Sequence, residues 1–472
     1  AACDHRSTMA TEQWSSRLGF LLATVGAAVG LGNIWRFSAV LGANGGGAYL
    51  VPYLLAAFVC AVPLLVLELA VGRALRTDVV SAFRSVDATY APLGWLVVGG
   101  VVLILSYYLV LTGWVLGFLL VWLAGIETTF AAFTDSWLPV GYFVVATVLT
   151  GAVVSLGVRG GIERMAKLVM PTVFAVLVGL AAYGATLSGW GDAVSFLFTP
   201  DRSVLGDPGL WSAAFGQVFF SLSVGQGIML TYGSYVDEGT DLLRSSLLVT
   251  VTDIGAALLS GLVIFPIVFS FGLQPTLGTE LAFTTLPTAF GTMPGGRLVA
   301  VAFFGLLFFA ALSSAVGLLE VGVAAASNAT RLSRASATRA LTVGVFVLGL
   351  PSALSYSPVD LALAGRPVLD LVDESVGTYA LPVSALLITY SFVWASEFDG
   401  VRDALGRLYP LVRYVTPALL LAVTAARLAG VARPAWRLLV GRTQAGSLGA
   451  AVAASVLLLV AAVGWRRKRR PN

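Results

Sequence analysis

The sequence predicts an all-α membrane protein with about twelve membrane-spanning helices. Hydrophobic residues make up 58% of its 472 positions, and the mean hydropathy is +0.91. Only 11% of the residues are charged, against about 25% in a typical soluble domain. Apolar runs of about 20 residues, the length that a helix needs to cross the hydrocarbon core, recur along the whole chain. These observations exclude a soluble fold of this length.

Each predicted span is an apolar stretch bounded by polar, glycine- or proline-containing connections. The stretches lie at 18–41, 49–71, 94–124, 139–157, 165–188, 211–235, 244–273, 297–326, 338–355, 375–396, 408–430 and 445–465. An even number of spans places both termini on one side of the membrane. The basic cluster at 466–470 directly follows the last span, which is typical of a cytoplasmic end.

One connection does not fit this topology. The loop between the last two spans, on the predicted outer side, carries Arg427, Arg433, Arg437 and Arg442. Basic residues are usually enriched on the cytoplasmic side. Either this loop breaks the rule or the boundaries of the last two spans are misdrawn.

The first span contains an interruption at residues 28–37, which read AVGLGNIWRF. Gly30 and Gly32 weaken the helix, while Asn33 and Arg36 bring polar and charged groups to membrane depth. Non-helical backbone at that depth persists only where it lines a protein cavity, and an intramembrane charge indicates a functional site. Exposed backbone amides and carbonyls suit a small zwitterion and a cation, which indicates a transporter.

The sixth span contains a second interruption at residues 220–227, which read FSLSVGQG. Serines and glycines again lie in the middle of a membrane-length stretch. Paired interruptions in corresponding halves of a chain are typical of transporters built from inverted repeats, with the binding site between the repeats. Sequence identity between the two halves is not visible, so the repeat is inferred from the breaks.

These motifs resemble the neurotransmitter:sodium symporter family, in particular its prokaryotic sodium-dependent amino-acid transporters. The resemblance covers about residues 12–430. It rests on RLGF at 17–20, AVGLGN at 28–33, RF at 36–37, NGGGA at 44–48, PY at 52–53, Glu68 with GR at 72–73, YY at 107–108, GQ at 216–217, FFSLS at 219–223 and ALSS at 311–314. It implies a LeuT-like fold, a 5+5 inverted repeat with broken helices 1 and 6.

The resemblance also implies a division of the chain into an N-terminal tail, two inverted repeats and a C-terminal part. Residues 1–16 are expected to form an N-terminal cytoplasmic tail, and 17–200 the first inverted repeat with helices 1–5. Residues 201–400 would form the second repeat with helices 6–10, and 401–472 would hold helices 11–12 and the basic cytoplasmic C-terminus.

By resemblance, two sodium sites are expected. The first set comprises the Ala28 carbonyl and the side chains of Asn33, Ser221 and Asp253, completed by the substrate carboxylate. The second set comprises the carbonyls of Gly26, Val29 and Ala310 and the hydroxyls of Ser313 and Ser314. A shared carboxylate would couple ion and substrate, because each would bind better when the other is present. Taken alone, such serines more often bond to their own or a neighbouring helix.

The substrate carboxylate is expected to meet the backbone amides of Leu31 and Gly32 at the start of a half-helix, together with the Tyr108 hydroxyl. The ammonium would meet the carbonyls of Ala28, Phe220 and Ser221. Amine-transporting relatives place an aspartate at the position of Gly30, so this glycine implies a ligand with its own carboxylate, such as an amino acid.

The side-chain pocket implied by the resemblance is mostly apolar, which favours a hydrophobic or aromatic amino acid. Its members are Ala27, Ile104, Tyr108, Phe220, Ser223, Gln226, Ser314 and Leu318. Gln226 departs from the large apolar residue often found at its position. A buried amide needs partners, and the sequence leaves open whether Gln226 reads a polar substrate atom, a water or a neighbouring helix.

The resemblance further implies an outer gate of Arg36 and Asp373, bridged through Gln217 and covered by Phe220; a permanent structural ion pair is the alternative. The inner gate of many relatives is an arginine–aspartate pair, but Thr11 and Asn328 stand at those positions here. Trp14 is either a plug for that end or an interfacial anchor.

Two further expectations concern helices 7 and 5. Many relatives have an asparagine where Asp253 stands, and some keep an acid where Ala257 stands, so an ionised Asp253 predicts transport without chloride. Gly161 and Pro171 have the family's spacing for unwinding of helix 5, although a simple proline kink is the alternative.

The remaining predictions are mostly absences. His5 is the only histidine, Cys3 and Cys60 are the only cysteines, and neither an H-E-x-x-H nor a G-x-S-x-G motif occurs. We therefore expect no enzyme and no cofactor apart from two co-transported sodium ions. The predicted partners are a small amino acid, Na⁺ and the plasma-membrane bilayer, with no nucleic acid, for a monomer or homodimer. Proton coupling, a compatible solute, a channel and a non-transporting sensor remain alternatives.

Overall fold

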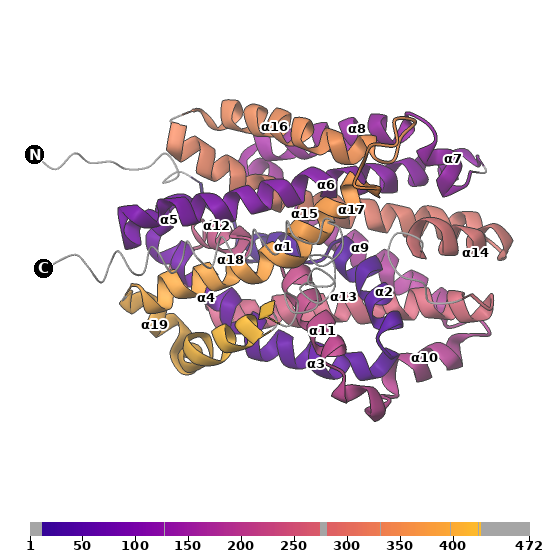
Figure 1. The fold of residues 1–472 in the computed structure, drawn as a ribbon, viewed down its shortest axis with the longest axis horizontal. Helices are drawn as coiled ribbons and strands as arrows, with labels where there is room; N and C mark the ends of the chain where they lie inside the picture. Colours follow the sequence, from indigo (N-terminus) through magenta and orange to yellow (C-terminus); the bar gives the residue numbers. More distant parts are fainter. Residues whose placement is uncertain are drawn as a thin grey trace, which may run out of the picture.

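The computed structural model describes residues 12–425 apart from residues 127, 274–280, 331, 397 and 423. Helices that run along one long axis form most of the molecule (Figure 1). Among the described residues, eight helices are long and apolar enough to cross a membrane, and one bent pair adds a ninth. The predicted all-α membrane fold is confirmed. The span predicted at 445–465 and the basic cluster after it lie outside the described residues.

The first span is broken, as predicted. α1 (Arg17–Ala28) begins at Ser16, whose side chain accepts a hydrogen bond from the Gly19 amide, and it ends where Val29 becomes extended. The second half begins with a π-helical turn (Gly32–Arg36) and continues as α2 (Phe37–Ala43). The axes of the two halves differ by 53°.

The second to fifth spans have no comparable bend. The second comprises a 3₁₀ turn (Gly46–Tyr49), α3 (Leu50–Ala56), a π-helical turn (Ala57–Ala61) and α4 (Val62–Leu75), and α5 (Val79–Val86) and a 3₁₀ turn (Ala88–Tyr90) follow. The next are α6 (Ala91–Ala124), α7 (Phe130–Thr134), α8 (Leu138–Ser155), a π-helical turn (Val158–Glu163) and α9 (Arg164–Gly184). Pro171 lies inside α9 without ending it.

The sixth span is also broken. α10 (Trp190–Phe198) and a 3₁₀ turn (Arg202–Gly206) lead into α11 (Pro208–Ser221), and α12 (Ile228–Gly233) resumes after a non-helical segment. Within that segment φ is positive at Ser223 (+53°), Gly225 (+81°) and Gly227 (+70°), a conformation that no α-helix contains. Both breaks expected from the glycine-containing motifs are therefore present.

The remaining described elements complete the bundle. They are α13 (Leu242–Ser270), a π-helical turn (Leu281–Thr285), α14 (Leu286–Thr292), α15 (Gly296–Thr330), α16 (Arg334–Leu354), the hairpin of β1 (Ala362–Leu363) and β2 (Arg366–Pro367), α17 (Val368–Val372), a π-helical turn (Asp373–Thr378), α18 (Tyr379–Thr389), a π-helical turn (Tyr390–Trp394), α19 (Asp399–Leu405), a 3₁₀ turn (Gly406–Leu408) and the apolar helix Leu411–Ala422.

The tenth span begins earlier than predicted, at Val368 rather than at 375. The prediction treated Asp370, Asp373 and Glu374 as a polar connection. They occupy the first turns of the helix instead, where acidic side chains interact favourably with the positive end of the helix dipole. Asp373, a predicted gate residue, is therefore carried by a helix.

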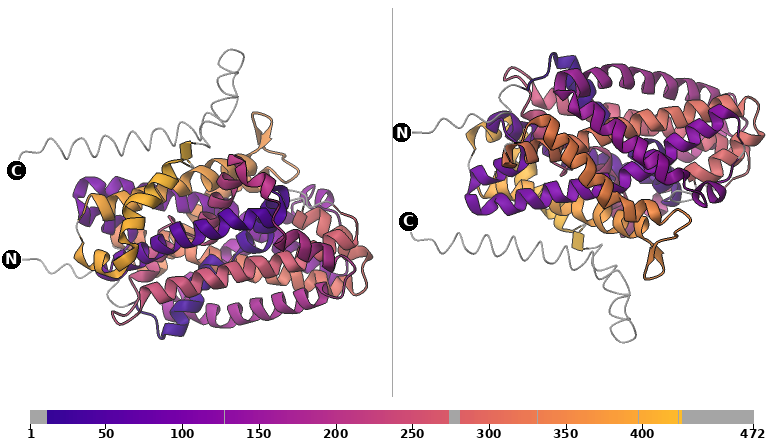
Figure 2. Two further views of the ribbon diagram at one scale, coloured as in Figure 1. Left: turned by 90° about the horizontal axis from the view of Figure 1, so that it is seen from below. Right: turned by 90° about the horizontal axis from the view of Figure 1, so that it is seen from above.

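The long helices α6 and α15 pack against each other along the bundle, and α1 lies against α15 and α9. Figure 2 shows the same lengthwise arrangement from two further sides. Large apolar side chains also face outward, for example Leu168 and Leu298, which are 73% and 75% exposed. Outward-facing leucines of this kind suit a hydrocarbon environment.

Candidate substrate and ion-binding site

The break in the first span is held against two other helices. The Leu31 amide donates to the Tyr108 hydroxyl oxygen of α6 over 3.3 Å, and the Gly30 amide donates to the Asn33 side-chain oxygen over 3.1 Å. A Cβ atom on Gly30 would lie 2.5 Å from Ser314 Oγ and 2.8 Å from Tyr108 Oη. Glycine is therefore required here, because it lets α6 and α15 approach the broken backbone.

The break in the sixth span is fixed by a buried acid. The Gly225 amide donates to a carboxylate oxygen of Glu68 in α4 over 2.7 Å, and Glu68 is buried. The Ser223 hydroxyl donates to the Ala27 carbonyl of α1 over 3.0 Å. The two broken helices are thus bonded to each other and to their surroundings at the same depth.

Three buried side chains from different helices converge beside these breaks. The Asn33 amide nitrogen donates to Asp253 Oδ1 over 2.6 Å and to Ser221 Oγ over 2.8 Å, and Ser221 Oγ donates to Asp253 Oδ2 over 2.9 Å. All three side chains are at most 1% exposed. The structure thus brings together the side chains of the first predicted ion set. Hard oxygen atoms of this type suit Na⁺.

A second group of oxygens lies between α1 and α15. The Ser313 hydroxyl donates to the Gly26 and Ala310 carbonyls over 2.7 and 2.9 Å, and Ser314 bonds to the same two carbonyls at 3.3 Å. Four of the five members of the second predicted ion set are therefore in mutual contact. Val29, the fifth, follows α1 directly at the break.

A small cavity lies between the two breaks. Its volume is about 20 Å³, room for about one water molecule. The lining comprises Ala27, Ala28, Gly30, Gly32, Ile104, Tyr108, Phe220, Ser223, Gln226, Ser314 and Leu318. All eight residues of the predicted side-chain pocket are among them. Leu31 does not line the cavity, but its backbone amide donates a hydrogen bond to the Tyr108 hydroxyl.

Two of the predicted outer gate residues, Arg36 and Gln217, contact residues that line this cavity. The Arg36 guanidinium stacks over the Phe220 ring, 4.2 Å from its centroid, and the Gln217 amide donates to the Gly32 carbonyl over 2.6 Å. Among the described residues no ion pair joins Arg36 to Asp373, so that pair stays a prediction. Phe220 covers the cavity, with Gly32 against its ring.

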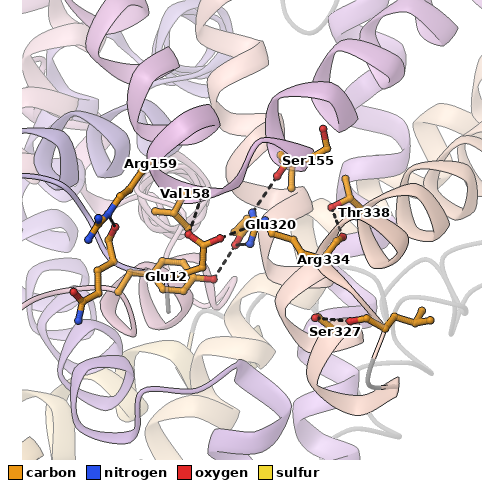
Figure 3. A network of polar contacts seen from close by, with 12 residues as sticks. Glu12, Ser155, Val158, Arg159, Glu320, Ser327, Arg334 and Thr338 are labelled. Atoms are coloured by element: carbon orange, nitrogen blue, oxygen red, sulfur yellow. Dashed lines mark hydrogen bonds and ion pairs between the residues drawn. The ribbon is translucent and has the colours of Figure 1, made fainter. Parts of the chain in front are cut away.

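The end of the bundle where residues 12–16 lie is closed by a charged network (Figure 3). Arg334 of α16 forms a two-pronged pair with Glu320 of α15, at 2.5 and 2.9 Å, and the Tyr235 hydroxyl donates to the same carboxylate over 2.8 Å. Glu12 lies 3.8 Å from Arg334 and accepts from the Val158 amide. The network joins the N-terminal segment to four other elements.

A second acid holds the same segment. The Glu163 carboxylate accepts hydrogen bonds from the Ser15 amide, from the Ser15 and Ser16 hydroxyls and from Lys167. A Cβ atom on Gly19 would lie 1.9 Å from Glu163 Oε1. This carboxylate therefore fits only against a glycine in α1.

Trp14 is only 6% exposed and donates from its indole nitrogen to the Tyr232 carbonyl. It packs within the protein against Phe20, Tyr232 and Tyr235, the arrangement expected of a plug. Asn328 donates to Asp78 over 2.7 Å, whereas Thr11 lies outside the described residues.

The sequence analysis missed the roles of Glu12, Glu163, Glu320 and Arg334. One signal was present for two of them. Glu163 and Glu320 are acids inside membrane-length helices, and such residues pair with a partner or serve a function.

Two helices broken at matched depth around buried oxygen clusters and a small cavity define a broken-helix secondary transporter. The comparisons with known proteins agree. The family model described as the sodium:neurotransmitter symporter family matches residues 11–138 and 140–467. The chain belongs to this family, and it is a multi-pass, sodium-dependent membrane transporter rather than an enzyme.

Three relatives illustrate the similarity. YhdH of Bacillus subtilis, an uncharacterized sodium-dependent transporter, is 36% identical over 390 residues, which cover 80% of this chain and 86% of YhdH. An uncharacterized sodium-dependent transporter of Methanocaldococcus jannaschii is 32% identical over 428 residues, 85% of each chain. The crystal structure of MhsT in complex with L-phenylalanine has a TM-score of 0.81 and 37% identity, covering 87% of this chain and 98% of MhsT. The LeuT-like fold expected from the sequence is thereby confirmed.

Proposed function

We propose that this protein imports an amino acid together with sodium ions by alternating access. The observation that carries the proposal is the convergence of Asn33, Ser221 and Asp253 beside a small cavity between two broken helices. A buried carboxylate beside a serine hydroxyl suits a cation. The amides at the start of the half-helix suit a carboxylate.

The substrate class follows from the walls of the cavity. Gly30 contributes no carboxylate, so the ligand supplies its own, as an amino acid does. Ala27, Ile104, Phe220 and Leu318 are apolar and favour a hydrophobic or aromatic side chain. MhsT was crystallised with L-phenylalanine, which supports the same class.

Two sodium ions would bind at the two oxygen clusters. The first would take the Ala28 carbonyl and the side chains of Asn33, Ser221 and Asp253, together with the substrate carboxylate. The second would take the carbonyls of Gly26, Val29 and Ala310 and the hydroxyls of Ser313 and Ser314. The shared carboxylate makes the coupling reciprocal, since each ligand raises the affinity of the other.

In the proposed topology the protein lies in the plasma membrane, and both of its termini are on the cytoplasmic side. Residues 17–200 and 201–400 would form the two inverted repeats. The bonds that hold residues 12–16 to the bundle support a conformer that is closed on the cytoplasmic side. Arg36 stacked on Phe220 would pair with Asp373 when the outer side closes.

Transport should be independent of chloride. Asp253 supplies a negative charge beside the first ion, so no separate anion is needed there. Replacement of chloride by gluconate should leave the initial rate of uptake unchanged, and a loss of uptake in gluconate would contradict this role of Asp253.

The test of the whole proposal is uptake of radiolabelled amino acids by the purified protein in proteoliposomes. Uptake should require an inward sodium gradient and should be competed by hydrophobic or aromatic amino acids. A proton gradient that drives uptake without sodium would contradict sodium coupling. Sodium-dependent binding with no accumulation inside the vesicles would indicate a sensor.

A further inference from the structure

Gln226 is held in the centre of the sixth-span break by a fixed backbone. Its neighbours Gly225 and Gly227 both have positive φ. A Cβ on Gly225 would lie 2.9 Å from the Leu381 carbonyl oxygen, and one on Gly227 would lie 2.6 Å from a methyl of Val79. With both neighbours packed this closely, residue 226 has little freedom. Its side chain lines the cavity and is 3% exposed.

The other polar side chains of the cavity already have partners. Ser223 donates to the Ala27 carbonyl, Ser314 donates to the Gly26 carbonyl, and Tyr108 accepts from the Leu31 amide. The Gln226 amide has no hydrogen-bond partner anywhere in the part of the chain that the structure describes. A neighbouring helix therefore does not satisfy it within those residues.

A buried amide is satisfied by protein, by water or by a ligand. The cavity has room for about one water molecule. A substrate side chain is larger than this space, so it can enter only where the walls move apart, and it then displaces that water. If the side chain is wholly apolar, it cannot replace the lost hydrogen bonds, and affinity falls.

We propose that Gln226 selects amino acids whose largely apolar side chain carries one hydrogen-bonding group, such as tyrosine or tryptophan, over apolar analogues of the same shape. The inference rests on the proposed amino-acid transport and narrows its substrate class. Ala27, Ile104 and Leu318 accommodate the apolar body of the side chain, and Gln226 bonds its polar atom.

The expected discrimination follows from the cost of leaving one buried polar group unpaired. It corresponds to roughly a 5- to 150-fold preference for the polar member of a matched pair. Tyrosine against phenylalanine and tryptophan against 1-naphthylalanine are suitable pairs, because the members of each pair differ little in size.

The experiment compares kcat/KM for these pairs in sodium-driven uptake by the full chain in proteoliposomes. The wild type should prefer tyrosine and tryptophan at least about fivefold. Gln226→Met, of similar length but without the amide, should bring both ratios close to one. Thr112→Val is the matched control, since Thr112 is buried in α6 and donates to the carbonyl of Tyr108. Its ratios should equal those of the wild type.

A wild type that transports phenylalanine and tyrosine equally well would overturn the inference and leave amino-acid transport standing. Unchanged ratios in Gln226→Met would overturn it too. The wild-type ratio needs no variant, so misfolding of Gln226→Met leaves the test decisive. A wild type with no sodium-driven uptake of any amino acid would instead overturn the proposed function, and this inference with it.

Discussion

Substitution of Gly30 tests the arrangement on which the site depends. The Cβ of Gly30→Ala would overlap Ser314 Oγ at 2.5 Å and Tyr108 Oη at 2.8 Å, closer than such atoms can approach. Both hydroxyls must move away from the substrate and the second ion set. Loss of one hydrogen bond to a charged carboxylate costs about 1.5–3 kcal/mol, so KM should rise roughly 10- to 150-fold.

Gly30→Asp should abolish amino-acid uptake, because it adds the same Cβ and also a carboxylate that repels that of the substrate. Initial rates of uptake in proteoliposomes with an inward sodium gradient give the KM of Gly30→Ala and show whether Gly30→Asp transports at all. Gly100→Ala in α6 is the matched control, since a Cβ there meets nothing within 4 Å and KM should stay that of the wild type. Uptake by Gly30→Asp at the wild-type rate would refute the reasoning.

Three further variants address the ions and the N-terminal segment. Asp253→Asn removes the buried charge of the first ion set, and the half-saturating sodium concentration for uptake should rise at least about tenfold; an unchanged sodium dependence would exclude Asp253 as a ligand. Ser313→Ala removes the hydroxyl nearest the Gly26 carbonyl and should lower the Hill coefficient for sodium toward one, whereas a coefficient equal to that of the wild type would count against a second ion there. Gly19→Ala displaces the Glu163 carboxylate, and a cysteine introduced by Ser234→Cys should then react with a permeant thiol reagent at least about fivefold faster; equal rates would show that this carboxylate does not hold the segment.

Most of the membrane fold could be predicted from the sequence, because hydropathy sets the length of each span and glycines mark the breaks. The limits of the tenth helix could not. A hydropathy pattern assigns acidic residues to a polar connection between spans. Asp370, Asp373 and Glu374 nevertheless lie in the first turns of a helix and stabilise its start. The start of this helix depends on the negative charge of these side chains, which interact favourably with the positive end of the helix dipole. A hydropathy value does not record the sign of a charge.

The residues that line the cavity were all named in the sequence analysis, although their role in substrate binding stays a prediction. The charged network around residues 12–16 was not predicted. Part of the lining comes from short motifs around the breaks, such as FSLSVGQG, and the rest, Ile104, Tyr108, Ser314 and Leu318, was implied by the family resemblance. The network joins Glu12, Glu320 and Arg334 across more than 300 positions of the chain. Contacts of that range depend on how helices pack, which no local pattern specifies.

The break in the sixth span has a consequence for how the protein can diversify. Its shape depends on Glu68, Gly225 and Gly227, none of which lines the cavity. Residue 226 is held between them but contributes only its side chain to the wall. A substitution at that position can therefore change the substrate preference while the backbone of the break stays intact. Residue 226 is for this reason a suitable starting point for directed evolution of the substrate specificity.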